Sequence, residues 1–122
     1  MSADTVEART PDRPVVLSDV ASSLLAETTS SGTGNAAVTL TPGADAGGFR
    51  QTLVAMTEGS GLDPDHWNGP ASVQVVVGAA RVTDGGEGST IGEGQWTQLT
   101  SAGATVRAEQ DTVVLLTVAP DA

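Results

Sequence analysis

The sequence predicts an all-β domain, and three observations carry this prediction. Short apolar segments recur along the chain, and turns containing glycine separate them. The chain has 15 glycines but only one Phe, two Trp and no Tyr, so Val, Leu and Ala must fill the core. Only one stretch near the N-terminus has apolar residues at helical spacing. Small branched residues favour strands, and several short strands with regular turn signals indicate a sandwich or a barrel.

Length and charge limit the number of domains and the classes of partner. A chain of 122 residues corresponds to one domain. The 15 acidic residues oppose 5 basic ones, all of them arginine, which gives a net charge of -10. Binding to nucleic acid or to an anionic membrane needs a basic surface. Because the sequence offers none, we expect neither partner.

The sequence also excludes several kinds of catalytic and metal site, and it indicates a cellular location. The absence of cysteine excludes disulfides, thiolate catalysis and zinc–cysteine sites. No serine lies in a GxSxG pattern, and the glycine-rich residues 85–94 lack the lysine and the helix of a phosphate-binding loop. The catalytic residues of any reaction are therefore unknown. The polar N-terminus does not read as a signal peptide, and no apolar run approaches the roughly 20 residues that span a bilayer. We expect a cytoplasmic protein.

The first part of the chain predicts an arm and a helix. Residues 1–14 are charged and contain two prolines, so we expect a flexible arm. The alternative is an ordered arm that crosses to a partner subunit. Ser18 is expected to cap a short helix that ends at Glu27 or Thr28. Residues 15–122 are expected to form a single domain.

The rest of the chain predicts strands and turns. Gly78 indicates a bend, since glycine inside a strand pattern often marks a bulge or a corner. Asp84-Gly85-Gly86 is a hairpin signal. Residues 59–70 are expected to form a loop. Both alternating faces of residues 49–56 are half apolar, which fits a strand of a closed or two-layered sheet. Strands are expected at residues 36–40, 49–56, 71–77, 79–83, 90–91, 95–99, 104–108 and 112–118.

Three segments of the chain carry a family resemblance. The stretch from Gly61 to Gly78 contains the only histidine, His66, and ends in the strongest β run. The segment GQWTQLT begins at Gly94, and the segment DTVVLLTV closes the last strand. In order and spacing these segments resemble the two sequence motifs and the final strand of the cupin family. The resemblance runs from Ala37 to Val118.

The resemblance implies a cupin-type double-stranded β-helix, or jelly-roll barrel, of the small bacterial, RmlC-like kind, with a short N-terminal helix. It also implies a homodimer formed by strand exchange or sheet packing. An exposed edge strand gives a physical reason for such pairing. Cupins that bind a metal use two histidines and a glutamate from the first motif and one histidine from the second.

Most of these metal ligands are missing here. His66 is the only histidine of the protein, and a catalytic metal generally needs three protein ligands. We therefore expect a metal-free protein without a cofactor. The alternative is a divalent transition metal held by His66, with Asp63 and Asp65 as further ligands. The positions of the missing ligands and of neighbouring motif residues hold Pro64, Asn68, Ala71 (or Pro70, if the loop shifts by one), Gln95, Thr100 and Ala104.

His66 is expected to be vestigial or hydrogen-bonded at the barrel mouth. Alternatively, it is a lone acid or base in a metal-free pocket. Each tryptophan either walls a pocket or packs structurally, in the barrel or at a dimer interface. The glutamines either point into the interior or face solvent. Arg107 either anchors an anionic ligand or lies on the surface. The candidate pocket-lining residues are His66, Trp67, Gln74, Trp96, Gln98 and Arg107.

Three functions follow from these observations. The first is a non-catalytic module, which binds a small molecule or has a structural role. The second is a metal-dependent cupin enzyme of the dioxygenase or isomerase type, with an atypical ligand set around His66. The third is a dimeric, acidic component of a larger assembly. The missing ligands favour the first.

Overall fold

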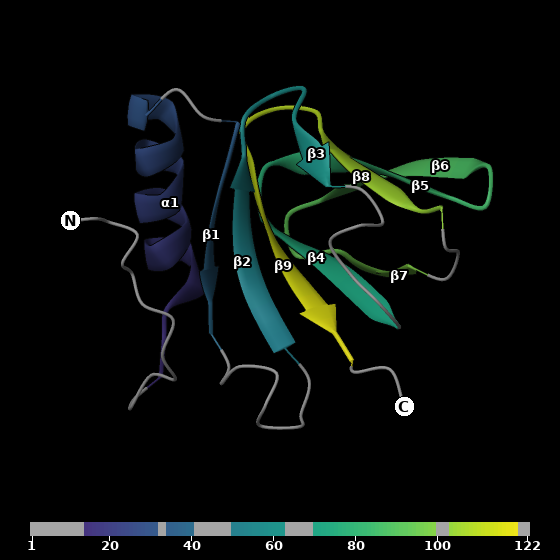
Figure 1. Ribbon diagram of the computed structural model, residues 1–122, viewed down its shortest axis with the longest axis horizontal. Helices are drawn as coiled ribbons and strands as arrows, with labels where there is room; N and C mark the ends of the chain where they lie inside the picture. The colour runs from purple at the N-terminus through teal and green to yellow at the C-terminus, as the bar shows by residue number, and fades with distance from the viewer. Residues whose placement is uncertain (1–13, 32–33, 41–49, 63–69, 100–102, 120–122) are drawn as a thin grey trace.

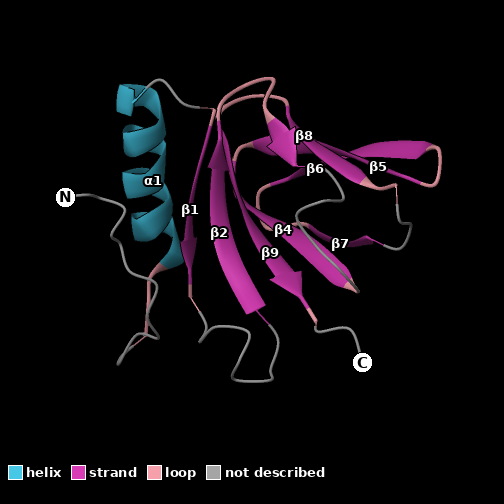
Figure 2. Ribbon diagram, viewed as in Figure 1, coloured by secondary structure: helices cyan, strands magenta, loops and turns pink. Residues whose placement is uncertain are grey.

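A single helix and two antiparallel sheets make up the described part of the protein (Figure 1). The computed structural model describes residues 14–31, 34–40, 50–62, 70–99 and 103–119. The all-β prediction with one N-terminal helix is confirmed (Figure 2). The elements are α1 (Leu17–Ser31), β1 (Asn35–Thr39), β2 (Arg50–Met56), β3 (Gly61–Leu62), β4 (Ala71–Val77), β5 (Ala79–Asp84), β6 (Glu87–Gly92), β7 (Trp96–Leu99), β8 (Thr105–Ala108) and β9 (Thr112–Val118).

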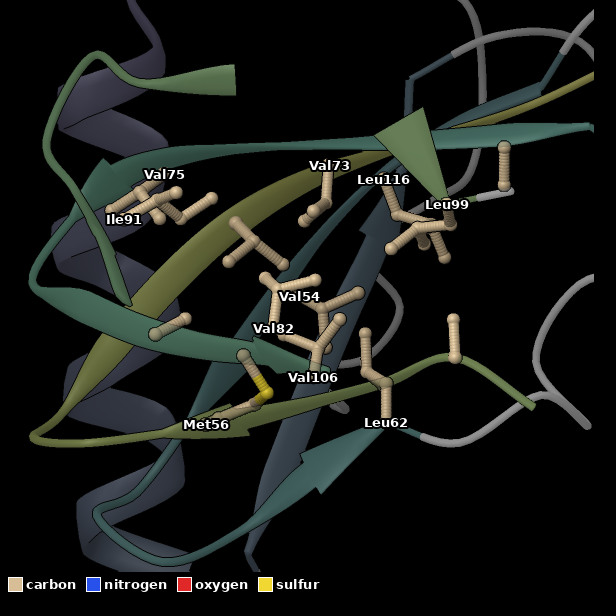
Figure 3. Packing of buried hydrophobic residues seen from close by; sticks show 14 of the residues in the cluster. Val54, Met56, Leu62, Val73, Val75, Val82, Ile91, Leu99, Val106 and Leu116 are labelled. Atoms are coloured by element: carbon tan, nitrogen blue, oxygen red, sulfur yellow. The ribbon is translucent and has the colours of Figure 1, made fainter. Parts of the chain in front are cut away.

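The two sheets face each other across an aliphatic core. One sheet has the order β1-β2-β9-β4-β7, and the other has the order β3-β8-β5-β6. Side chains from both sheets point toward one another between them (Figure 3). Burying such apolar area is the main favourable term in folding. The buried cluster comprises Val54, Met56, Leu62, Ala71, Val73, Val75, Ala80, Val82, Ile91, Leu99, Ala104, Val106, Ala108, Val114, Leu116 and Val118.

The first sheet is buried on both faces near its centre. Strand β2 pairs with β9 along its whole length, from Arg50 opposite Val118 to Met56 opposite Thr112. Val54 and Met56 belong to the core between the sheets, whereas Leu53 belongs to a second cluster beneath the helix. The sequence prediction of two half-apolar faces for this strand is therefore confirmed.

Helix α1 covers the outer face of the first sheet (Figure 1). Its Ala21 and Leu24 are buried in one cluster with Leu53, Ala55 and Val113 of β2 and β9. This arrangement explains how an outer sheet face can be as apolar as the inner one. A helix with one apolar stripe needs such a partner surface to be stable.

The predicted helix ends were wrong. The helix begins at Leu17, and the backbone N–H of Asp19 donates to the carbonyl of Val16 at 3.0 Å, so Ser18 lies inside the first turn and does not cap it. The helix continues past Thr28 to Ser31. The Thr28 hydroxyl donates to the carbonyl of Leu24 at 2.9 Å. This bond inside the helix satisfies a polar side chain that the sequence pattern placed at the terminus.

Most strands lie within a residue of their predicted positions, with two differences. Strand β3 occupies Gly61–Leu62, inside the predicted loop. It was not predicted, because two residues are too few to show an alternating pattern. Strand β6 covers Glu87–Gly92 and is longer than predicted. It is poor in apolar residues and is held by pairing with β5 across a hairpin, where Gly85 and Gly86 have φ of 67° and 87°. The hairpin itself was predicted.

The predicted bend at Gly78 is the corner where the chain passes from one sheet to the other. Gly78 has φ of 93°, and a Cβ placed on it would lie 2.6 Å from both the carbonyl oxygen of Asp111 and Oγ1 of Thr112. The Thr112 hydroxyl is buried and lies within hydrogen-bond distance of three backbone atoms. It can donate to the carbonyl of Ala79 at 2.9 Å or of Gln110 at 2.7 Å, and it accepts from the Ala79 N–H at 3.2 Å.

We expect Gly78→Ala to lower the free energy of unfolding by about 3 kcal/mol, because backbone strain and a steric clash act together. Urea denaturation of the purified variant measures this. The matched control is Gly86→Ala, since Gly86 has φ of 87° but a Cβ placed on it would have nothing within 4 Å. The control should lose only about 1 kcal/mol. Equal losses in the two variants would show that the close contact with β9 contributes nothing.

Candidate functional site

The barrel interior holds alanine at two positions where the cupin resemblance would place metal ligands. Ala71, at the glutamate position, is 5% exposed, and Ala104, at the last histidine position, is fully buried. Both belong to the aliphatic core cluster, which also contains Val73, Leu99 and Val106. The space between the sheets at these positions is therefore filled by hydrocarbon.

These residues do not fit a metal centre. A metal needs oxygen, nitrogen or sulfur donors, and alanine side chains have none. Within the described ranges, no three His, Cys, Asp or Glu side chains gather closely enough to hold a metal ion. His66, with Asp63 and Asp65, lies outside the described residues.

A pocket of about 390 Å³ opens beside the core, between β1, β2, β9 and β3. Its floor consists of Val54, Leu62, Leu116 and Val118, all of which also belong to the core cluster. Pockets of 300–1,000 Å³ with apolar walls and a few polar groups are typical ligand sites. The residues that line it are Asn35, Ala36, Ala37, Thr39, Arg50, Thr52, Val54, Leu62, Leu116 and Val118.

Strand pairing explains how this pocket receives its polar groups. Thr39 of β1 is the register partner of Thr52 of β2, so the two hydroxyls lie on the same sheet face. Arg50 precedes Thr52 by two residues on β2 and shares that face. Asn35, at the other end of β1, donates from Nδ2 to the carbonyl of Gly61 at 3.4 Å. The pocket therefore combines an apolar floor with two hydroxyls, an amide and one guanidinium.

Arg50 is the only ionisable residue among the described residues that line this pocket. Its side chain is half-buried. Among the described residues, no carboxylate pairs with it, even though the chain carries 15 acidic residues. A half-buried guanidinium is suited to bind an anion, because it is positively charged and presents five N–H donors in a planar fork.

Three of the predicted site residues lie together, but outside the barrel. Trp96 and Gln98 of β7 are the register partners of Gln74 and Ser72 of β4. Their neighbours Val73 and Leu99 are in the core, so these side chains project from the opposite face. The solvent-facing alternative for the glutamines is the one observed. Trp96 is 58% exposed, so it does not plug the barrel.

Trp96 and Gln98 border a shallow depression of about 210 Å³ on this outer face. Its lining residues are Pro70, Ala71, Ser72, Trp96, Gln98, Thr117 and Ala119. Gln74 is not among them, although its backbone is paired with that of Trp96. The depression is separate from the pocket that contains Arg50.

Of the remaining predicted residues, only Arg107 is described, and it lines neither the pocket nor the depression. Arg107 lies on β8, is exposed, and donates from Nη1 to the carbonyl of Gly59 at 3.0 Å. This is the surface alternative of the sequence analysis. His66 and Trp67 lie outside the described residues, so their expected roles stay predictions.

Arg50 is the residue that the sequence analysis missed. A signal for it was present in the sequence, because Arg50 shares an alternating strand face with the apolar residues Val54 and Met56. A charged residue that shares one strand face with apolar residues is a candidate pocket group. The neighbouring β1 and β3, which complete the pocket, could not be assigned to it from the sequence.

Comparison with known proteins was informative only at the level of structure. No family model matches the sequence, and no curated protein matches it significantly. Among solved structures, the Cupin_2 domain of an XRE family transcriptional regulator from Enterobacter cloacae has a TM-score of 0.59 and 17% identity. The match covers 73% of this chain and 100% of that one. A cupin superfamily protein from Desulfitobacterium hafniense has a TM-score of 0.61 and 10% identity, over 71% and 78% of the two chains.

This protein has the cupin fold. The predicted jelly-roll barrel is therefore confirmed. Cupin folds with this similarity also occur within larger enzymes. A salicylate 1,2-dioxygenase from Pseudaminobacter salicylatoxidans has a TM-score of 0.60 and 17% identity, over 83% of this chain but only 32% of that one. Because the similar structures include enzymes and regulators, the cupin fold alone does not assign an activity here.

No helix in the described part of the chain is both long and apolar enough to cross a membrane.

Proposed function

We propose that this protein is a non-catalytic cupin-fold module that binds a small anionic molecule with an apolar body. The observation that carries this proposal is Arg50, which faces a pocket of about 390 Å³ and has no carboxylate partner among the described residues. The aliphatic packing around Ala71 and Ala104 supports a site without a metal.

The lining of the pocket selects the chemistry of the ligand. A carboxylate can accept two parallel hydrogen bonds from a guanidinium, and such charge-assisted bonds are about twice as strong as neutral ones. The hydroxyls of Thr39 and Thr52 can donate to the same anion. The floor of Val54, Leu116 and Val118 favours a hydrocarbon body. A monocarboxylate with a short aliphatic or aromatic body satisfies each of these groups.

We also propose that the module acts as a homodimer in the cytoplasm and engages neither nucleic acid nor membranes. Strand β1 lies at the edge of the five-stranded sheet, and an edge strand offers unpaired N–H and C=O groups to a second copy. The net charge of -10 supports the exclusion of phosphate-rich partners.

We expect hexanoate and benzoate to bind the wild-type protein more tightly than hexanamide and benzamide, because only the acids carry the charge that Arg50 recognises. Arg50→Gln should weaken binding of the acids by about tenfold or more and leave the amides unaffected. Isothermal titration calorimetry measures all four ligands.

Arg107→Gln is the matched control, since it removes the same charge from an exposed position on another sheet. It should leave acid binding unchanged. Equal binding of acids and amides, or equal losses in the two arginine variants, would contradict the proposed role of Arg50.

Metal analysis separates this proposal from the enzyme alternative. We expect protein purified without chelator to contain far less than one iron, manganese, nickel or zinc ion per chain, because the described residues offer no cluster of donor groups. Inductively coupled plasma mass spectrometry measures this, with His66→Ala as the comparison. A nearly stoichiometric metal that disappears in His66→Ala would favour an enzyme whose ligands include His66 and loop aspartates.

A further inference from the structure

An exposed tryptophan stands on β7, the edge strand of the first sheet that lies away from the helix (Figure 1). Trp96 begins this strand and is 58% exposed. Among the large hydrophobic side chains of the described residues, only Val16 is similarly exposed. Tryptophan combines a broad apolar face with one N–H donor, so an exposed indole beside a depression can serve as a binding surface.

The depression beside Trp96 has a mostly apolar surface with an amide and two hydroxyl side chains in its described lining. None of the described residues lining this depression is ionisable, in a chain whose net charge is -10. Register pairing places Gln74 beside Trp96, and Ser72 beside Gln98. An uncharged surface of this kind does not fit a metal, a phosphate or a charged peptide.

The polar groups form an ordered row across the sheet. Gln98, Ser72, Thr117 and Gln51 are successive register partners on β7, β4, β9 and β2. Gln51 donates from Nε2 to Oγ1 of Thr117 at 3.2 Å, which fixes one end of the row. The side-chain amides of Gln74 and Gln98 have no hydrogen-bond partner among the described residues. Each such amide offers two donors and one acceptor to a ligand.

We propose that this face, defined by Trp96, Gln98, Gln74, Ser72 and Thr117, binds a neutral saccharide. The C–H face of a pyranose ring is apolar and slightly positive, so it stacks on the negative face of an indole. The hydroxyl groups at the ring edge both donate and accept, as primary amides and hydroxyls do. A neutral sugar therefore matches a flat aromatic platform with uncharged polar groups beside it.

The small depression beside Trp96 favours a small ligand over a second copy of the chain as its occupant. Stable interfaces between proteins bury about 1,200–2,000 Å² and have an apolar centre. Here the depression beside the indole holds only about 210 Å³, and Ser72, Gln98 and Thr117 contribute polar groups to its lining. One or two sugar rings are of the right scale. A single stacked ring gives weak binding, with a Kd on the order of 1 mM.

Nuclear magnetic resonance titrations with maltotetraose, cellotetraose and chitotetraose test this proposal. With at least one of these probes, we expect the Trp96 indole N–H and the side-chain amides of Gln74 and Gln98 to shift and saturate. Trp96→Ala should weaken binding at least about tenfold, and Trp96→Phe should weaken it less. Gln98→Ala, a smaller change, gives a second variant if Trp96→Ala does not fold.

Arg50→Gln is the control, because it removes the charge of the separate pocket and should leave saccharide binding unchanged. The saccharide proposal and the carboxylate proposal can therefore be refuted independently of each other. The proposal is overturned if none of the three probes shifts these signals, or if binding survives in Trp96→Ala. It is also overturned if the signals respond only to protein concentration and Trp96→Ala abolishes a dimer, which would make the face an interface between copies.

Discussion

The corner at Gly78 is the constraint on which the rest of the structure depends. The chain must leave the five-stranded sheet and enter the four-stranded sheet within one residue, and only glycine adopts the required φ without strain. The Thr112 hydroxyl bonds to the backbone of Ala79 on one side of this corner and can bond to Gln110 before β9. The carboxylate of Glu93 accepts from the Gly78 N–H at 3.2 Å. The corner is thus tied to the central strand and to the turn before β7.

Once the corner fixes the two sheets face to face, the residues between them decide what the barrel can do. Among the described residues they are aliphatic, including Ala71 and Ala104 at the positions that the family resemblance assigns to metal ligands. This packing stabilises the fold, and the polar groups of the two described pockets lie at its margins. Arg50 lies at one margin, beside β1, and Trp96 lies at another, on the outer face of β7. Both proposed binding sites therefore lie outside the aliphatic core.

Sequence reasoning recovered the parts of the fold that depend on local chemistry. The β5–β6 hairpin and the corner at Gly78 were predicted because glycine supplies backbone conformations that other residues avoid. The helix ends were missed because Ser18 and Thr28 are also compatible with helix interiors. The candidate site was recovered less well. Whether Trp96 points inward or outward depends on strand register, and a pocket formed by four strands depends on contacts between residues far apart in the chain.

The most direct test of the filled barrel is the stability of Ala104→His as a function of pH, because the substitution places histidine where a metal-binding cupin would have it. In a closed aliphatic interior the neutral form is favoured, so burial lowers the folded pKa below the unfolded value of about 6.5. The unfolded state then binds more protons, and stability falls as pH decreases through that value. Thr105→His, at the next and exposed residue, is the control.

Relative to the control, we expect Ala104→His to lose about 2–4 kcal/mol at pH 8 in urea denaturation, and to lose more at about pH 5.5. That result would show a packed interior without room for a ligand set. If Ala104→His and Thr105→His have the same stability and the same pH dependence, the interior is open to water, and the central claim of a filled barrel is wrong.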